Sequence, residues 1–101
     1  MEHRHQLATK HFKEIAESEQ KVWPDHQWHG EIENCDVCSR PMKDEQFMID
    51  GPAEARPSPV WGNICVICAY KYSPTIGWGK AQLYERDEDG VWRLVAGGPP
   101  A

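Results

Sequence analysis

Four cysteines arranged in two identically spaced pairs are the residues of this sequence with the clearest chemical potential. Cys35 and Cys38 form one C-x-x-C pair, and Cys65 and Cys68 form the other. Two residues between ligands allow a tight backbone turn that aims both sulfurs at one point, where backbone N–H groups can donate to them. Two such turns complete a closed tetrahedron of thiolates that leaves no position for water. We therefore expect one structural Zn²⁺ per chain on these four cysteines.

Other uses of four cysteines require a context that the sequence does not supply. A redox C-x-x-C belongs to a thioredoxin-like βαβ unit, which the pattern here does not predict. Disulfides require an oxidising compartment. Residues 1–21 are rich in charge and contain no apolar stretch of the kind found in signal peptides, so we expect a cytoplasmic protein with reduced thiols. An iron–sulfur cluster also uses four thiolates, and it stays open as an alternative.

Length and charge narrow the class of protein. A chain of 101 residues has room for one domain with a modest core, so a metal ion would contribute much of its stability. The sequence has Lys+Arg 11 against Asp+Glu 16, a formal net charge of −5. Binding to a phosphate backbone depends on an excess of Lys and Arg. The charge therefore favours a protein partner over a nucleic acid.

The first 24 residues are predicted to contain an amphipathic helix, from His5 to Trp23, that ends before Pro24. Apolar residues recur at spacings of three and four, interrupted by Glu19, and comprise Ala8, Phe12, Ile15 and Val22. We expect this stripe to pack on the rest of the domain. The alternative is a contact surface for a partner or for a second copy of the chain, in which Phe12 and Ile15 would take part.

Residues 25–95 are predicted to form the zinc-binding domain, in an α+β fold. Short strands are expected at 45–50 and 60–64, and a short helix at 69–72. Two further strands, 81–86 and 91–95, flank an Asp-Gly bend and predict a hairpin. The terminal segment 96–101, AGGPPA, is expected to be disordered.

The order of cysteine pair, hairpin, cysteine pair and helix looks like a treble clef. The segments CDVC, FMIDGP and VWGNICVICA resemble the zinc-binding domain at the N-terminus of the ClpX unfoldase family, over roughly a third of the chain. The resemblance implies a treble-clef fold and a protein-binding or dimerising role. This chain departs from the family by a longer loop between the pairs, a histidine-rich lead-in and the C-terminal hairpin. Since these 101 residues contain no ATPase module, the resemblance does not carry over unfoldase activity. A zinc ribbon is the alternative fold.

Histidines and tryptophans are the other residues with functional potential. His26 and His29 precede the first cysteine pair, and they are either a second metal site or ordinary surface histidines. Trp61 and Trp92 lie in predicted strands and are expected to pack in the core. Trp28 and Trp78 lie in predicted loops, where they either cover the zinc site and the helix or serve as anchors for a partner.

These observations predict a non-enzymatic, zinc-stabilised adaptor or inhibitor that binds another protein, because no arrangement of catalytic side chains is recognisable. Small acidic chains of this kind are typical of phage and mobile-element proteins. One alternative is a nucleic-acid-binding zinc finger, which would need the scattered basic residues to converge on one face: Arg40, Lys43, Arg56, Lys71, Lys80 and Arg86. The other is a redox or metal-responsive switch that unfolds when zinc is lost.

Overall fold

The computed structural model describes residues 3–19, 21–28, 31–53 and 60–100. Their helices and strands follow the chain in the order α1 (His3–Ser18), β1 (Phe47–Pro52), β2 (Trp61–Ile64), α2 (Val66–Tyr72), β3 (Gln82–Arg86) and β4 (Trp92–Ala96). The expected α+β class, with an N-terminal helix and short antiparallel strands, is confirmed. Of these helices, none combines the length and apolar character that a membrane span requires.

The four strands form one antiparallel sheet in the order β2-β1-β3-β4. The two predicted hairpins are β1–β2 and β3–β4, and they join because β1 also pairs with β3, with Ile49 opposite Leu83. Phe47, Met48 and Ile49 are all buried, so β1 is covered on both faces. An uninterrupted apolar run of this kind is typical of a central strand.

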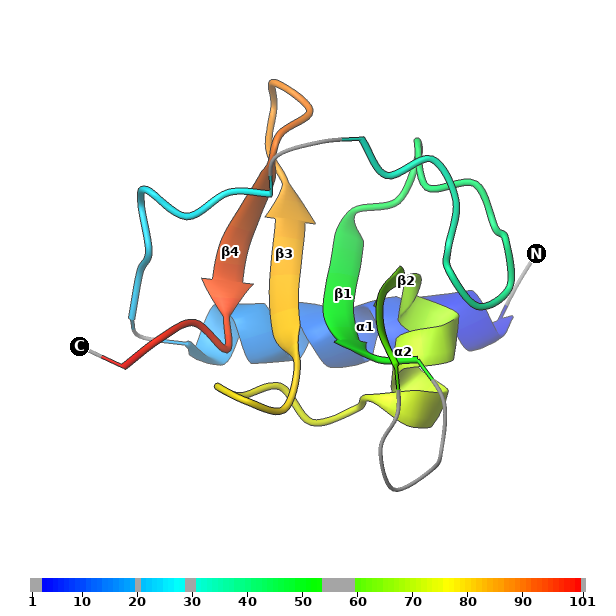
Figure 1. The fold of residues 1–101 in the computed structure, drawn as a ribbon, viewed down its shortest axis with the longest axis horizontal. Helices are drawn as coiled ribbons and strands as arrows, with labels where there is room; N and C mark the ends of the chain where they lie inside the picture. Colours follow the sequence, from blue (N-terminus) through cyan, green and yellow to red (C-terminus); the bar gives the residue numbers. More distant parts are fainter. Residues whose placement is uncertain (1–2, 20, 29–30, 54–59, 101) are drawn as a thin grey trace.

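Helix α1 runs behind the strands in Figure 1 and contacts both α2 and β4. Ala8 and Phe12 of α1 are fully buried, so the apolar stripe packs on the domain as expected. The helix ends at Ser18 rather than Trp23, and Val22 is 78% exposed instead of continuing the stripe. Trp23 leaves the helix because its indole is buried elsewhere, with Nε1 donating to the carbonyl of Pro99 at 3.0 Å.

The C-terminal segment is packed against the domain beyond Val95, where the sequence predicts disorder to begin. Strand β4 includes Ala96, and the glycines after it, Gly97 and Gly98, are buried. A Cβ at Gly98 would collide with the indole of Trp23, so glycine is what allows this close approach. The expectation of disorder from Ala96 onward is therefore corrected for residues 96–98, which close over Trp23.

The outer edge of β4 is covered by the segment that precedes the first cysteine pair. The N–H of Trp28 donates to the carbonyl of Trp92 at 3.0 Å, and the N–H of Leu94 donates to the carbonyl of His26 at 3.1 Å. Strand β2, at the opposite edge of the sheet, runs directly into the second cysteine pair. The two ends of the sheet thus differ, and the cysteines lie at the β2 end.

Candidate metal centre

The first cysteine pair lies in a tight turn between Asn34 and Pro41, which form an isolated β-bridge. The N–H of Cys35 donates to the carbonyl of Arg40 at 2.9 Å, and the N–H of Ser39 donates to the carbonyl of Cys35 at 2.9 Å. Ser39 has a φ of 64°, in the left-handed region that non-glycine residues rarely adopt. This residue reverses the chain directly after Cys38 and lets both sulfurs point the same way.

The second pair lies where β2 gives way to α2. Cys65 is the N-cap of α2, with φ −75° and ψ 167°, and its carbonyl accepts the N–H of Ala69 at 2.9 Å. Cys68 follows in the first turn of the helix. The sequence predicts the strand before Cys65, and the helix begins at Val66 rather than at Ala69. The strand-to-helix switch therefore sits between the two ligands.

Asp36 joins the two cysteine turns. Its N–H donates to the carbonyl of Asn63 at 3.1 Å, and its carboxylate Oδ2 accepts the N–H of Asn63 at 2.8 Å. The first turn is thereby fixed to the edge of β2 just before Cys65. Sequence reasoning does not identify Asp36, because nothing in the residue order shows that it faces Asn63.

The four sulfurs lie close enough to share one ion. All of them lie within 4.8 Å of one another, and the Sγ atoms of Cys38 and Cys65 are 3.7 Å apart. A tetrahedral ion with bonds of ~2.3 Å to sulfur separates its ligands by about 3.8 Å. A disulfide would require about 2.05 Å, and all four cysteines are free. The spacing therefore fits a single tetrahedral ion, as the C-x-x-C pattern predicts.

Hydrogen bonding within the cluster favours negative charge on Cys35. The Cys65 thiol, with help from backbone N–H groups, lowers the pKa of Cys35 to about 4. The Sγ of Cys35 accepts from the N–H of Val37 and of Cys65, each at 3.4 Å. The hydrogen bond with Cys35 raises the pKa of Cys65, and burial raises the pKa of Cys68 to about 12. Four neighbouring thiolates therefore need a cation to balance their charge, and a divalent ion supplies it.

The donor set suits a structural ion rather than a catalytic one. Cys35, Cys65 and Cys68 are buried, and Cys38 is exposed at the surface. Four thiolates fill a tetrahedral coordination sphere, so no position is left for water or substrate. Within the described ranges, these cysteines are the group of side chains arranged to hold a metal ion. His26 is exposed and outside this group, whereas His29 lies outside the described residues.

A polar cluster around Glu45 supports the first cysteine turn. Like the role of Asp36, it is not predicted from the sequence. Glu45 is only 7% exposed, and its carboxylate lies 3.0 Å from Nε2 of His5 and 3.6 Å from Nε of Arg40. His5 belongs to α1, and Arg40 follows the first cysteine pair. A buried carboxylate needs such partners to offset its desolvation. The cluster therefore connects the start of α1 to the loop that leaves the candidate metal centre.

The residues predicted to bind a partner differ in how exposed they are in the structure. Phe12 is fully buried, so its assignment to a contact surface is wrong, and Ile15 is partly buried against the core. Trp28 is half-buried, with its ring edge-on to Tyr84 at 6.1 Å. Trp78 is 60% exposed and stays a candidate. Trp61, expected in the core, is 45% exposed because it lies at the edge of the sheet.

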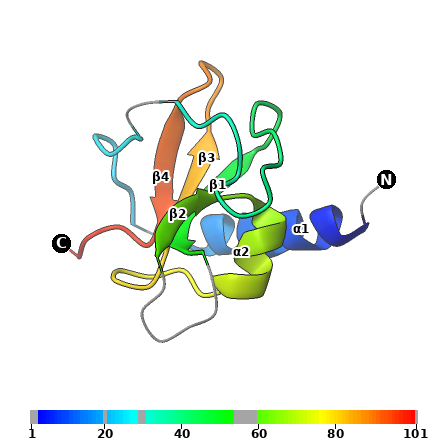
Figure 2. The same ribbon diagram turned by 45° about the vertical axis from the view of Figure 1, so that its right-hand side comes forward.

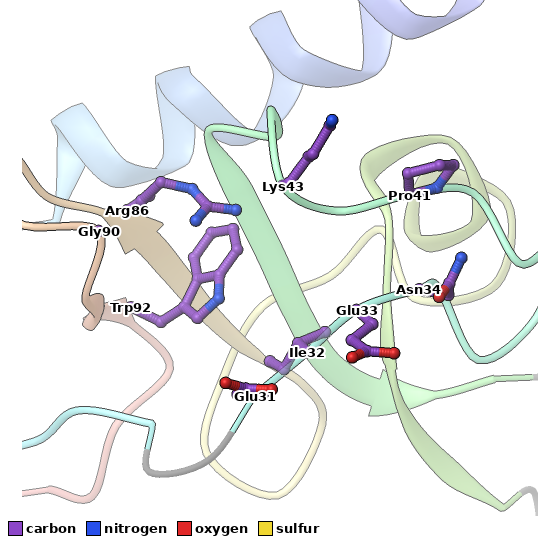
Figure 3. Close-up of a pocket in the computed structure, with 9 residues that line it drawn as sticks. All are labelled: Glu31, Ile32, Glu33, Asn34, Pro41, Lys43, Arg86, Gly90 and Trp92. Atoms are coloured by element: carbon purple, nitrogen blue, oxygen red, sulfur yellow. The ribbon is translucent and has the colours of Figure 1, made fainter.

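A hollow of about 520 Å³ lies between the lead-in to the first cysteine turn and the β3–β4 hairpin (Figure 3). Arg86 and Trp92 line one side, with the guanidinium 4.2 Å from the indole centroid, and Asn34 and Pro41 lie across from them. Nε of Arg86 donates to the carbonyl of Glu45 at 3.0 Å, and its NH2 group also donates to the carbonyl of Met42. Arg86 thus connects the loop that contains Met42 and Glu45 to the β3–β4 hairpin. Its role at the edge of the hollow is therefore structural.

Comparison with protein-family models, with curated proteins and with solved structures gives no match to this chain. The resemblance to the ClpX zinc-binding domain and the treble-clef description therefore stay predictions. What the structure establishes is the α+β fold and a cluster of four cysteines that could hold a metal ion.

Proposed function

We propose that this chain is a non-enzymatic protein-binding module whose fold is held by one Zn²⁺ on Cys35, Cys38, Cys65 and Cys68, in a treble-clef-like arrangement. Zinc is favoured because four thiolates at tetrahedral spacing are its preferred structural site. An iron–sulfur cluster places several atoms between its ligands and needs sulfurs more widely spread than 4.8 Å. The closed donor set supports a scaffold and offers no position for chemistry on a substrate.

The observation that carries the proposal is an exposed apolar surface built on both cysteine turns. Val37, Val60 and Trp61 are 39%, 62% and 45% exposed, and they line one hollow of about 460 Å³ together with Ala53 and Tyr72. Val37 lies between the first two ligands, and Trp61 begins the strand that leads to Cys65. We call this the knuckle surface. The metal ion would fix both of its sides.

The occupant we propose for the knuckle surface is an extended segment of another protein. Strand β2 is an outer strand, and Asn63 uses its N–H and carbonyl on the outer edge to bond Asp36. Residues two apart in a strand direct their backbone groups to the same edge, so those of Trp61 face outward as well. An extended segment can pair there while its side chains contact the exposed apolar groups.

The exposure of Cys38 gives specific support to a second candidate, a redox or metal-responsive switch. Oxidation of this thiolate would remove one ligand, release the ion and dismantle the knuckle surface. Titration of the thiols with and without zinc tests this candidate. Thiols that stay inert to oxidants while zinc is bound would reject it.

Photo-crosslinking tests the proposed function. A photoreactive amino acid placed at Val60 should crosslink a protein from a cell extract, and the product should disappear after chelation of zinc or after the Trp61→Ser substitution. Val22→Ser, at an exposed apolar residue outside the knuckle surface, is the matched control and should keep the crosslink. Recovery of nucleic acid in a salt-sensitive complex, or a crosslink indifferent to zinc, would contradict the proposal.

A further inference from the structure

A small groove lies between α1 and α2, apart from the knuckle surface, where the two helices pass each other in Figure 2. It has a volume of about 220 Å³ and is lined by Arg4, Leu7, Ala8, Ile67, Tyr70 and Lys71. Ala8 is fully buried at its base, while Leu7 and Tyr70 on the two helices are 48% and 49% exposed. The groove is thus apolar inside and bordered by large side chains that solvent reaches.

The size of the groove selects the kind of occupant. Sites for drug-sized ligands have volumes of about 300–1,000 Å³, so a groove of about 220 Å³ is too small for a whole ligand of that class. It suits one large apolar side chain that projects from a longer partner, as in the recognition of a peptide by a helical groove.

The charge at the groove is opposite to that of the chain as a whole. Arg4 on α1 and Lys71 on α2 line it, and its described lining contains no carboxylate, although the net charge of the chain is −5. Neither cation makes an ion pair with a described residue, and Nζ of Lys71 lies 5.1 Å from the ring centroid of Tyr72. Both positive charges therefore remain available to a partner that carries carboxylates.

The walls of the groove are held in place before any partner arrives. The imidazole of His11 lies edge-on to Tyr70 at 5.0 Å, and its Nε2 donates to the carbonyl of Pro74 at 2.8 Å. Ile67, on the α2 wall, lies between Cys65 and Cys68 and is therefore positioned by the candidate metal centre. A preformed groove lowers the entropic cost of binding.

We propose that this groove binds an acidic, apolar segment of another protein. One large apolar side chain enters between Leu7 and Tyr70, and carboxylates on either side of it contact Arg4 and Lys71. Two cations suffice for a short acidic segment, whereas binding to an extended phosphate backbone or an anionic membrane depends on a larger cluster of Lys and Arg than this groove offers. The site is separate from the knuckle surface, so either site can fail without the other.

Synthetic peptides provide the test. Three blocked, fluorescent peptides carry the same central Leu-Phe pair, flanked by Glu, Gln or Lys, and their binding to the zinc-loaded full chain is measured by polarisation at low salt. The Glu-flanked peptide should bind about five- to tenfold more tightly than the Gln-flanked one, as two exposed ion pairs allow. In NMR spectra of the protein, the amide shift changes that this peptide causes should concentrate in α1 and α2.

Matched variants locate the effect. The double substitution Arg4→Gln and Lys71→Gln should abolish the preference for Glu, whereas Lys13→Gln with Lys80→Gln, both exposed lysines outside the groove lining, should retain it. Leu7→Ser should weaken all three peptides alike. Zinc content is measured for every variant, so loss of the scaffold is recognised separately from loss of the groove.

Four results would overturn the proposal. The first is the absence of binding by any peptide to a zinc-loaded chain. The second is equal affinity for the Glu- and Lys-flanked peptides. The third is a set of NMR shift changes centred on the knuckle surface. The fourth is tighter binding to vesicles of anionic lipid than to the Glu-flanked peptide, which would assign the groove to a membrane surface instead.

Discussion

Asp36 offers a sharp test of how the two cysteine turns are held together. Its carboxylate accepts the N–H of Asn63 at 2.8 Å, and its own N–H donates to the carbonyl of Asn63 at 3.1 Å. Asp36→Ala removes the first bond and keeps the second. It therefore loosens the connection between the first turn and β2 without removing a ligand.

The expected magnitude follows from the strength of that bond. A hydrogen bond to a charged group contributes about 1.5–3 kcal/mol, and Asp36 is exposed, so water replaces part of it. We expect a loss of about 1 kcal/mol in unfolding free energy, equivalent to a decrease of about 4–8 °C in Tm for a domain of this size. Residues that orient metal ligands typically contribute about 10- to 100-fold in affinity, and we expect the lower end here.

Competition with a chromophoric chelator measures zinc affinity, and calorimetry measures Tm. Asp44→Ala is the matched control, because it removes one exposed carboxylate from the loop beyond the first turn and changes the net charge equally. Asp36→Asn, which keeps an oxygen acceptor, should fall between the wild type and Asp36→Ala. Wild-type zinc affinity and Tm in Asp36→Ala would refute the role assigned to this residue.

Three further predictions follow from the described contacts. Ser39→Gly should be at least as stable as the wild type in chemical denaturation, and Ser39→Val should lose about 1–2 kcal/mol, because φ is 64° there; the reverse order would be inconsistent with that backbone. Arg93 lowers the pKa of the Asp87 carboxyl, so the part of the Arg93→Gln destabilisation that comes from this ion pair should be constant at neutral pH and vanish as the pH falls through that lowered pKa. The loss of the hydrogen bond from Arg93 to the side chain of Gln27 should remain at all pH values, and a difference that grows in acid would contradict this account. Trp92→Ala, at a buried site, should lose about 3–5 kcal/mol, and Trp78→Ala less than about 0.5 kcal/mol; equal losses by thermal unfolding would argue against the packing described.

The candidate metal centre was predictable because the spacing of its ligands is a pattern within a few consecutive residues. The C-x-x-C spacing specifies a turn that aims two sulfurs together, and this holds whatever surrounds it. The hairpins were predictable for the same reason, since alternating strands around a bend are a local pattern.

Features that depend on contacts distant in sequence were not predictable. The pairing of β1 with β3 joins two hairpins through a register that neither contains. Asp36 and Glu45 acquire their roles from Asn63 and His5, which lie far away along the chain. The end of α1 at Ser18 is likewise decided by Trp23, which packs on the C-terminal segment.

Native mass spectrometry of the purified chain, with and without a strong chelator, tests the central claim most directly. One zinc ion per chain is predicted, and its removal should broaden the charge-state distribution as the chain loses compactness, because binding contributes about 10–16 kcal/mol to small zinc domains. A metal-free mass that is lighter by the hydrogens of two disulfide bonds, or a mass that includes an iron–sulfur cluster, would contradict the four-thiolate zinc site.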